Sequence, residues 1–390
     1  MRGRKNKTMH EKLVLSVLLA AVLASGVHAA DKPRNVILFG WDGAQRNHVN
    51  GCLARGQLPT LKRLADEGAL VEINIMGTTD TKAGWTEILT GYGPKVTGVY
   101  SNHKYDTVPK GLSIFERLEE KYGKDSFVTV AVIGKKGHCG EINPPQKIRL
   151  GADGKETGDT AGKVRPKRRK RRRRPGASKQ PHGKIIEENG VKYRVIPASP
   201  YYNMHSALEV WEFGLMKDEK VGTKALSYLE KYKDKPFFFF VHFAEVDHSG
   251  HKHGENSKEY TNALISNDTW TGKIIAKLKE LGLYDNTLVI VTADHGFDEG
   301  DDSHRYAPYV FLAANTKKVN RNGLRGDVTP TIYDLLGVDA STFKPKLDGS
   351  TLTKRAPPNT PKFVRRRPEA AARKGRGRKG DANKGRQKTQ

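Results

Sequence analysis

The 390-residue sequence predicts an α/β fold, in which a doubly wound, mostly parallel sheet is flanked by helices. Short, continuous apolar runs of strand length alternate along the chain with segments of helical periodicity. Several of these runs end directly in an acidic residue, as at NVILFGWD (35–42) and TLVIVTAD (287–294). Because parallel sheets bind ligands beyond the carboxyl ends of their strands, this pattern also predicts where a site lies.

The first half of the chain alternates regularly. Strands are expected at 35–40, 69–76 and 126–134, and helices at 58–68, after Thr81 and at 113–123. In the second half, helices are expected at 206–216 (SALEVWEFGLM), 224–233, 257–282 and 327–337, and strands at 236–243, 287–296 and 309–314. Gly68 is the last residue of the segment 58–68 and is expected to end this helix.

Three segments are predicted to lie outside this body. Residues 1–29 combine basic residues, an apolar run and a small-residue end, which indicates a secretory signal cleaved after Ala29 and a secreted or periplasmic location. An uncleaved anchor is less favoured, because about 20 apolar residues are needed to span a bilayer and this run is shorter. The catalytic domain is expected at 31–353, with a basic, disordered insertion at about 145–190 and a basic, disordered tail at 354–390.

The formal net charge of +26 is concentrated in these appendages. Residues 163–174 hold ten Lys and Arg and no acid, and residues 354–390 hold fourteen against two acids. Outside the signal, the insertion and the tail, the body has equal numbers of basic and acidic residues. The basicity therefore indicates polyanion partners for the appendages, such as nucleic acid, anionic polysaccharide or lipid headgroups, and says little about the chemistry of the body.

Cys52 and Cys139 are the two cysteines of the chain. In an exported protein they form one disulfide or remain as two buried thiols, and the sequence leaves both alternatives open. Two cysteines do not suffice for a typical thiolate zinc site.

Thr81 follows the polar run GTTD and precedes a segment that turns apolar, TKAGWTEILTG (81–91). A hydroxyl at the start of a helix lies beside unpaired N–H groups and the positive end of the helix dipole, an environment that stabilises a phosphate. We expect Thr81 to be a nucleophile. Its ordinary alternative is a helix N-cap.

Acidic and imidazole side chains follow three of the predicted strands. Asp42, Asp247 with His251, and Asp294 with His295 can converge on one edge of a parallel sheet, although each alone is typical of a turn or a solvated loop. Together with His304 they provide mixed carboxylate and imidazole ligands, which suit two divalent ions and favour zinc. One ion is assigned to Asp42, Asp294 and His295, and the other to Asp247, His251 and His304.

These motifs resemble the alkaline phosphatase superfamily, most closely its nucleotide pyrophosphatase/phosphodiesterase and single-domain alkaline phosphatase branches. The likeness extends over most of residues 34–352 and includes NVILFGWDG (35–43), TKAGWTEILTG, GVYSN (98–102), VDHSGHKHG (246–254) and ADHG (293–296). The resemblance implies that the ion held by Asp42, Asp294 and His295 activates Thr81. It also implies that Asn102 donates a hydrogen bond to a phosphate oxygen; the alternative for Asn102 is a turn residue.

The sequence differs from the motifs of related enzymes at two places, and these differences bear on the class of ester that it cleaves. The residues after Thr81 do not match the sulfatase motif C/S-x-P/A-x-R, so sulfate hydrolysis is not supported. Lys135 matches the first residue of a Lys-x-Arg pair that binds phosphate in single-domain alkaline phosphatases, but Gly137 replaces the arginine. Monoester preference therefore stays open, and Lys135 is either a substrate-binding residue or a solvated lysine.

The sequence accordingly predicts an exported two-metal hydrolase that cleaves phosphodiesters, pyrophosphates or phosphomonoesters through a covalent phosphothreonine. The alternatives are a polyanion- or surface-binding protein with a vestigial catalytic body, or a sulfatase-like hydrolase.

Deletion of residues 354–390 tests the division of roles between body and tail. We expect retention on heparin to shift to lower salt, because phosphate and sulfate attraction by Lys and Arg is salt-dependent, while the rate on a small phosphate ester stays unchanged. A large loss of rate in the truncated protein would contradict this division.

Overall fold

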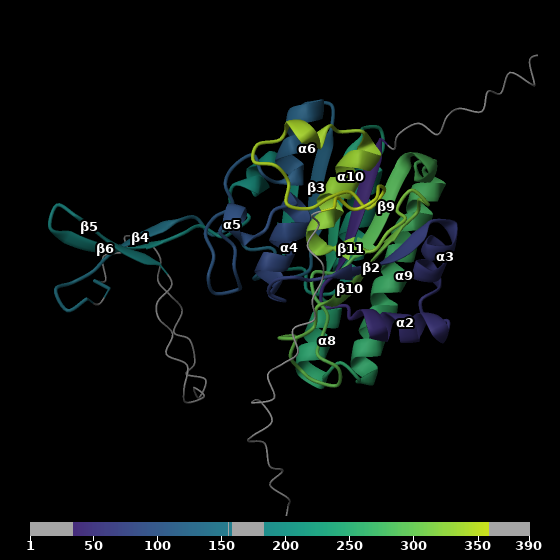
Figure 1. The fold of residues 1–390 in the computed structure, drawn as a ribbon, viewed down its shortest axis with the longest axis horizontal. Coiled ribbons are helices and arrows are strands. Elements are labelled where there is room, and N and C mark those ends of the chain that lie inside the picture. The colour runs from purple at the N-terminus through teal and green to yellow at the C-terminus, as the bar shows by residue number, and fades with distance from the viewer. Residues whose placement is uncertain (1–33, 155, 158–182, 359–390) are drawn as a thin grey trace, which may run out of the picture.

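The computed structural model describes residues 34–154, 156–157 and 183–358, and it is shown in Figure 1. The predicted signal, the basic run at 163–174 and the tail after residue 358 lie outside the described residues. Within these residues, no helix combines the length and the hydropathy that a membrane span requires. Cys52 and Cys139 are both buried, and each is a free thiol.

The body is built on an eight-stranded sheet in the order β11-β2-β10-β9-β1-β8-β3-β7. All neighbouring pairs are parallel except the two that β10 makes with β2 and β9, which are antiparallel. The predicted α/β class with a mostly parallel sheet is therefore confirmed. The strands are β1 (Asn35–Trp41), β2 (Ala69–Asn74), β3 (Val128–Ile133), β7 (Val210–Phe213), β8 (Phe237–Phe243), β9 (Thr287–Thr292), β10 (Tyr309–Ala314) and β11 (Gly323–Leu324).

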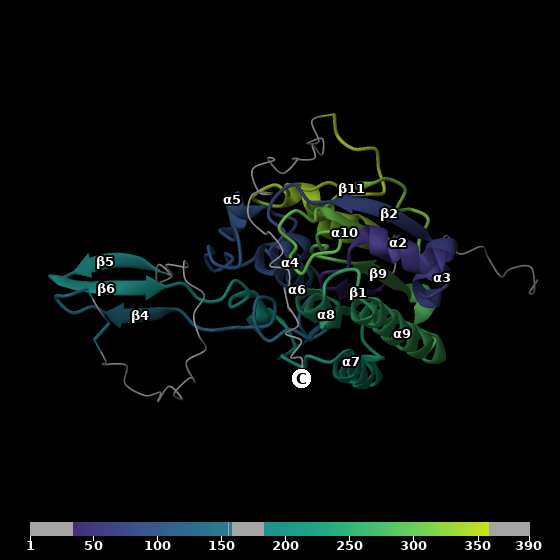
Figure 2. The ribbon, with the colours of Figure 1, turned by 90° about the horizontal axis from the view of Figure 1, so that it is seen from below.

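Helices cover both faces of this sheet. Figure 2 shows α7 and α9 on one side and α10 on the other. The helices are α2 (Arg46–Ala54), α3 (Pro59–Glu67), α4 (Thr81–Thr90), α5 (Pro94–Thr97), α6 (Ile114–Tyr122), α7 (Asp218–Tyr232), α8 (Glu245–His253), α9 (Lys258–Glu280) and α10 (Val328–Leu336), with short 3₁₀ turns η1 (Met204–Ala207), η2 (Tyr284–Asn286), η3 (Arg325–Asp327) and η4 (Ala340–Thr342).

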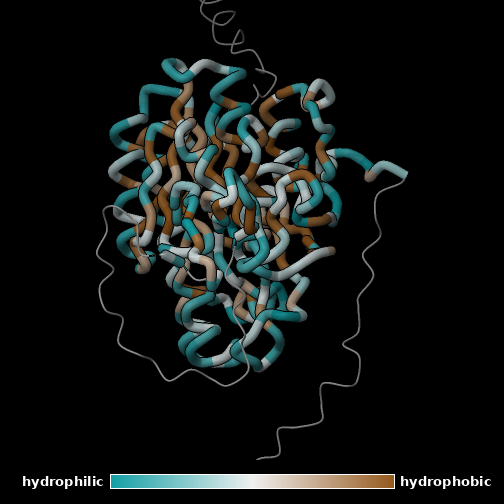
Figure 3. The backbone as a smooth tube through the Cα atoms, turned by 90° about the vertical axis from the view of Figure 1, so that its left-hand side faces the viewer, coloured by the Kyte–Doolittle hydropathy of each residue, from teal (hydrophilic) through white to brown (hydrophobic). Residues whose placement is uncertain are grey.

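The central strands are predominantly apolar because both of their faces are buried. Every residue of β1, β3, β8 and β9 is buried, including the four consecutive phenylalanines at 237–240. Figure 3 shows the same arrangement, with hydrophobic residues inside the body and hydrophilic residues on its outer turns. This rigid centre fixes the carboxyl ends of β9, β1 and β8 beside one another.

Two predictions of local structure are wrong. The segment 206–216 was expected to be helical, but it contains the strand β7, whose residues Val210–Phe213 pair in parallel with β3. Here pairing with a sheet edge outweighs a helical spacing of apolar residues. The helix α2 was not predicted, because its apolar spacing is weak and only Val49 and Cys52 are buried in it.

The insertion also contains more structure than expected. Three strands, β4 (Gln146–Arg149), β5 (Lys184–Glu188) and β6 (Val191–Ile196), form an antiparallel sheet in the order β4-β6-β5. The link between β5 and β6 is Asn189-Gly190, with φ of 51° and 74°. An Asn-Gly pair between two strands is a strong hairpin signal. The expectation of disorder at about 145–190 is therefore corrected at these strands.

His48 links α2 to the segment that precedes α9 and to the start of α9 through hydrogen bonds. Its Nδ1 lies 2.7 Å from Glu255 Oε1 and its Nε2 lies 2.9 Å from Thr261 Oγ1. Burial lowers the pKa of His48, but its hydrogen bonds with Cys52 and Glu255 outweigh burial and raise the pKa to about 9, from 6.5. The protonated imidazole is thus favoured in the folded state, so its contribution to stability is complete below pH 6.5 and is lost as the pH rises through about 9.

We expect Glu255→Gln to lower the free energy of unfolding at pH 6 by about 1 to 3 kcal/mol, because a charge-assisted hydrogen bond is lost. The deficit should shrink above pH 9. Urea unfolding at several pH values measures this effect, and Glu259→Gln, which changes an exposed carboxylate on α9, is the control. A deficit that does not change with pH would show that His48 is not charged in the folded protein.

Candidate active site

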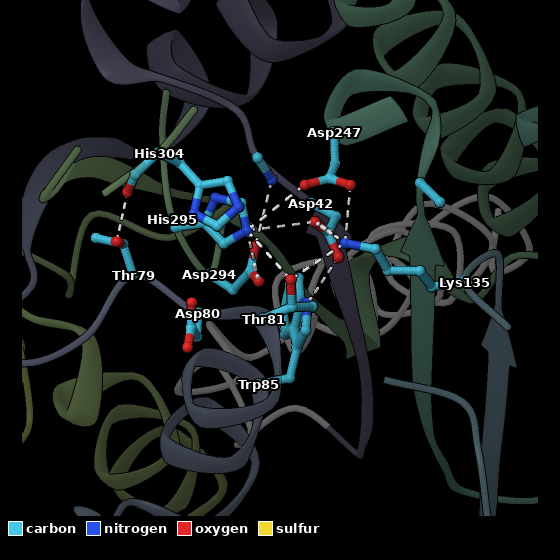
Figure 4. A network of polar contacts seen from close by, with 12 residues as sticks. Asp42, Thr79, Asp80, Thr81, Trp85, Lys135, Asp247, Asp294, His295 and His304 are labelled. Carbon is cyan, nitrogen blue, oxygen red and sulfur yellow. Dashed lines mark hydrogen bonds and ion pairs between the residues drawn. The ribbon is translucent and has the colours of Figure 1, made fainter. Parts of the chain in front are cut away.

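Polar side chains gather at the carboxyl edge of the three central strands, as Figure 4 shows. Asp42 directly follows β1, and Asp294 and His295 follow β9. Asp247 lies in the first turn of α8, the helix that follows β8. Because β9, β1 and β8 are adjacent and parallel, residues that are up to 253 positions apart lie in one site.

Thr81 is the first residue of α4, and Asp80 is the N-cap, so Thr81 does not serve as the cap. The Thr81 hydroxyl is buried and lies 3.3 Å from His295 Nε2 and 3.1 Å from Lys135 Nζ. The start of α4 therefore directs this hydroxyl into the group of carboxylates and imidazoles.

Asn102 lies against the start of α4. Its side-chain oxygen accepts a hydrogen bond of 2.9 Å from the backbone N–H of Lys82. The backbone N–H of Asn102 donates to Asp80 Oδ2 at 2.9 Å. Since the amide oxygen is held by the helix, the orientation of the amide is set and its NH₂ group is the end left for a ligand.

Asp42 is fully buried and is held from two sides. One carboxylate oxygen lies 2.8 Å from His242 Nε2 and accepts a hydrogen bond from Trp85 Nε1 at 3.2 Å. The other oxygen lies 2.9 Å from Lys135 Nζ. Burial raises the pKa of Asp42, but the Lys135 ammonium and the His242 hydrogen bond outweigh burial and hold this pKa well below its usual range.

Lys135 is buried at the centre of the site. Its ammonium forms ion pairs of 2.9 Å with Asp42 and 2.9 Å with Asp247. Burial lowers the pKa of Lys135, but attraction to Asp247 and Asp42 raises it above the ordinary lysine value. The lysine is thus charged and buried, not a solvated surface residue.

The Lys135 ammonium pairs with two of the three buried carboxylates of the site, and Asp294 is the third. Burial and then repulsion from Asp42 raise the pKa of Asp294 well above its usual range. Its Oδ1 accepts a hydrogen bond from the backbone N–H of Gly43 at 3.3 Å, whereas its Oδ2 is buried and has no hydrogen-bond partner. A further cation beside Asp294 would remove this imbalance.

His295 is suited to be a neutral ligand. Burial and then the neighbouring His304 lower the pKa of His295 to about 3, and their rings stack with centroids 4.0 Å apart. Its Nδ1 lies 2.9 Å from the carbonyl oxygen of Gly296, to which it donates, so Nε2 presents a lone pair to the carboxylates. Nε2 lies 3.5 Å from Asp294 Oδ2 and 3.7 Å from oxygens of both Asp42 and Asp247.

Two groups of side chains could each hold a metal ion, with all ligand atoms of a group within 4.8 Å of one another. The first consists of Asp42, Asp294 and His295, and the second of Asp247, His295 and His304. The residues fit divalent cations, because Asp247 Oδ1 and Asp294 Oδ2 are buried oxygens without hydrogen-bond partners. The first group is the set expected from the sequence.

The second group differs from the expected set in one member. His295 takes part in it, and His251 does not. His251 Nε2 lies 3.4 Å from Asp247 Oδ1, and its ring centroid lies 4.9 Å from that of His304. Its Nδ1 is oriented by the carbonyl oxygen of Asp302 at 2.9 Å. His251 is exposed at the rim of the site, and its assignment as a ligand stays a prediction.

Several supporting residues were not identified from the sequence. His242 is fully buried and contacts Asp42. Trp85 is buried and donates to Asp42. Arg325 donates 2.8 Å to the backbone oxygen of Asp294 and pairs with Glu87 of α4 at 2.6 Å. Only their burial, a tertiary property, distinguishes these residues.

Gly84 allows α4 to approach the end of β9 closely. A Cβ at this position would lie 2.8 Å from Asp294 Cβ and 3.1 Å from the backbone oxygen of Asp294. The helix that carries Thr81 can therefore lie against the loop that carries Asp294 only because residue 84 has no side chain.

Comparisons with known proteins agree with this geometry. The profile of the family described as type I phosphodiesterase / nucleotide pyrophosphatase matches residues 36–374. The bis(5'-adenosyl)-triphosphatase ENPP4 of Pongo abelii is 24% identical over 291 residues, which cover 73% of this chain and 53% of that protein. Ectonucleotide pyrophosphatase/phosphodiesterase family member 1 of Homo sapiens is 37% identical over 269 residues, which cover 68% and 24%.

Among solved structures, a protein in the alkaline phosphatase superfamily from Vibrio parahaemolyticus superposes with a TM-score of 0.49 at 18% identity, over 84% of this chain and 71% of that one. The chain spans about half the length of the ENPP4 relative that it matches.

Because His295 belongs to both candidate metal groups, replacing it tests the grouping. We expect His295→Ala to reduce bound zinc in both groups, and His251→Ala to leave at least the Asp42 group loaded, because only His295 belongs to both. Metal content by mass spectrometry after dialysis measures this difference. The exposed His253→Ala is the control, and equal zinc losses in the His295 and His251 variants would contradict the observed grouping.

Proposed function

The chain belongs to the type I phosphodiesterase / nucleotide pyrophosphatase family, and from this premise we propose that it hydrolyses phosphate esters with two divalent ions and Thr81 as nucleophile. The observation that carries the proposal is the position of the Thr81 hydroxyl. It lies at the first residue of α4, within 3.3 Å of His295, and faces the buried carboxylates at the ends of three strands.

The side chains that would hold the ions are those of the two groups, with His251 as a further candidate at the rim. Carboxylate and imidazole donors together favour zinc over magnesium or calcium, which prefer oxygen ligands alone. When bound, such a pair of ions polarises a phosphoryl oxygen and stabilises charge on the attacking and leaving oxygens.

The residues of the chain would act in two displacements. In the first, Thr81 Oγ1 attacks phosphorus in line, so that a bond forms between this oxygen and phosphorus and the bond to the leaving oxygen breaks. The product is a phosphothreonine. In the second, a water molecule attacks the same phosphorus, the bond to Thr81 breaks, and the hydroxyl is restored.

Three groups of the chain would hold the phosphoryl oxygens during these steps. The positive end of the α4 dipole lies at Thr81 and would favour an anion there. The Asn102 amide, whose oxygen is held by Lys82 N–H, presents its NH₂ to a non-bridging oxygen. The Lys135 ammonium, 3.1 Å from Thr81 Oγ1, adds a positive charge where negative charge develops.

A diester or pyrophosphate is the substrate class that we favour. The names of the relatives refer to pyrophosphatase, phosphodiesterase and triphosphatase activities. The residues around Lys135 also lack the arginine that completes the phosphate-binding pair of single-domain alkaline phosphatases, because residue 137 is glycine.

We further propose that the protein is exported and that its basic segments bind polyanions. The composition of residues 1–29 supports export. The basic run at 163–174 and the tail at 354–390 support the attraction of polyanions, which would hold a catalytic body close to an anionic surface or polymer.

Thr81→Ala should reduce kcat on bis(p-nitrophenyl) phosphate by about three orders of magnitude or more, because the nucleophile is removed. Zinc content should stay close to that of the natural protein. Thr81→Ser, which retains a hydroxyl, should keep measurable turnover and accumulate a labelled seryl phosphate after acid quenching. A fully loaded Thr81→Ala protein that retains its activity would exclude the covalent mechanism.

A further inference from the structure

A cavity of about 530 Å³ lies between the turn that carries Asn102 and the inserted three-stranded sheet. From the turn it is lined by Tyr100, Lys104 and Tyr105, and from the sheet by Lys184, Ile186 and Val195. Figures 1 and 2 show this sheet standing out from the body. The cavity thus has one wall in the body and one wall in the insertion.

One residue of the body wall, Tyr105, contacts the residue that follows Thr81. The Lys82 ammonium lies 4.1 Å from the centre of the Tyr105 ring, and Lys82 directly follows Thr81. Asn102 lies within the turn, whose ends are joined by hydrogen bonds from the N–H groups of Tyr100 and Ser101 to the carbonyl oxygen of Lys104. A group attached to a phosphate at Thr81 could therefore extend past Asn102 into the cavity.

The strand register shows how the sheet wall continues beyond the cavity. Val195 is opposite both Lys147 and Lys184, and two residues along β6 Tyr193 is opposite both Arg149 and Ile186. Because alternate residues of a strand share a face, these six side chains lie on the face that lines the cavity. We call this set of six residues the basic-aromatic face: Lys147, Arg149, Lys184, Ile186, Tyr193 and Val195.

The cationic and aromatic side chains of this surface suit a ligand that has a chain of phosphates and carries planar rings. Lys147, Arg149 and Lys184 are exposed cations, and the Lys147 ammonium lies 4.5 Å from the centre of the Tyr193 ring. Glu188 lies on the same face and pairs with Lys147, and Asp106 is the acid among the residues that line the cavity. Tyr100 is exposed on the opposite wall, with the Lys104 ammonium 4.6 Å from its ring centre.

We propose that the cavity and the basic-aromatic face bind single-stranded nucleic acid and direct one end of it to Thr81. This inference rests on the proposed function and names the substrate class of that site. Cationic side chains follow the phosphates, and tyrosine rings offer the stacking surface that unpaired bases use. A sulfated polysaccharide has comparable charge but no aromatic bases, so the tyrosines favour nucleic acid over it.

The test compares charge reversals on the two faces of the inserted sheet. Lys184→Glu changes the basic-aromatic face, whereas Lys192→Glu makes the same change on β6 but on the opposite face. Both proteins have the same net charge and the same basic run at 163–174, so only the position of the charge differs. Each variant is measured in the full, zinc-loaded chain on a short oligothymidylate and on bis(p-nitrophenyl) phosphate.

For Lys184→Glu, we expect kcat/KM on the oligothymidylate to fall by about threefold to tenfold. The slope of log kcat/KM against log salt concentration should become shallower by about one, because one phosphate contact is lost. The rate on the small diester should stay unchanged, and Lys192→Glu should alter neither rate. Equal losses for the two variants would overturn the proposal, because the charge would then act without regard to the face.

The aromatic part is tested with Tyr193. Tyr193→Ala should weaken binding of fluorescein-labelled oligothymidylate to the Thr81→Ala protein by about fivefold or more, and Tyr193→Phe should not, because stacking requires the ring and not the hydroxyl. If Tyr193→Ala has no effect and heparin competes as well as the oligonucleotide, the surface binds polyanions in general and the nucleic-acid proposal fails.

The two proposals can fail separately. Hydrolysis of bis(p-nitrophenyl) phosphate with no effect of Lys184→Glu on the oligonucleotide would reject the surface and keep the catalytic function. Face-dependent oligonucleotide binding without hydrolysis of either substrate would reject the catalytic function and keep the surface.

Discussion

The burial of three carboxylates at one edge of the sheet is the constraint on which the rest of the site depends. Asp42, Asp247 and Asp294 are held together by strand order, and a single ammonium, that of Lys135, lies between two of them. Their mutual repulsion is costly in a low-dielectric interior. The raised pKa of Asp294 and the two unpaired carboxylate oxygens are the marks of this cost, and both would be relieved by divalent cations.

Neighbouring side chains hold these carboxylates in place. His242 and Trp85 hold Asp42, while Arg325 joins the backbone at Asp294 to Glu87 of the helix that carries Thr81. Gly84 lets that helix lie against Asp294. Thr81 and the two candidate metal groups are therefore positioned by the same packed unit, and the proposed phosphoryl transfer would require such preorganisation.

The inserted sheet has a different relation to this unit. It adds no residue to the two metal groups, but it forms one wall of the cavity that lies against the turn at residues 100–104. Its strands are largely exposed, so their side chains can vary with little effect on the core. The proposed reaction chemistry and the proposed recognition of the group attached to phosphate thus lie in separate parts of the chain.

The sequence by itself determined the α/β class, the central strands and the convergence of Asp42, Asp247, Asp294 and His295, because buried parallel strands are continuous apolar runs and their ends share one edge. Only the tertiary structure decided that residues 210–213 are a strand, that Lys135 is buried between carboxylates and that His295 belongs to both metal groups. These properties depend on which elements become neighbours, and local sequence carries little information about pairing across such distances.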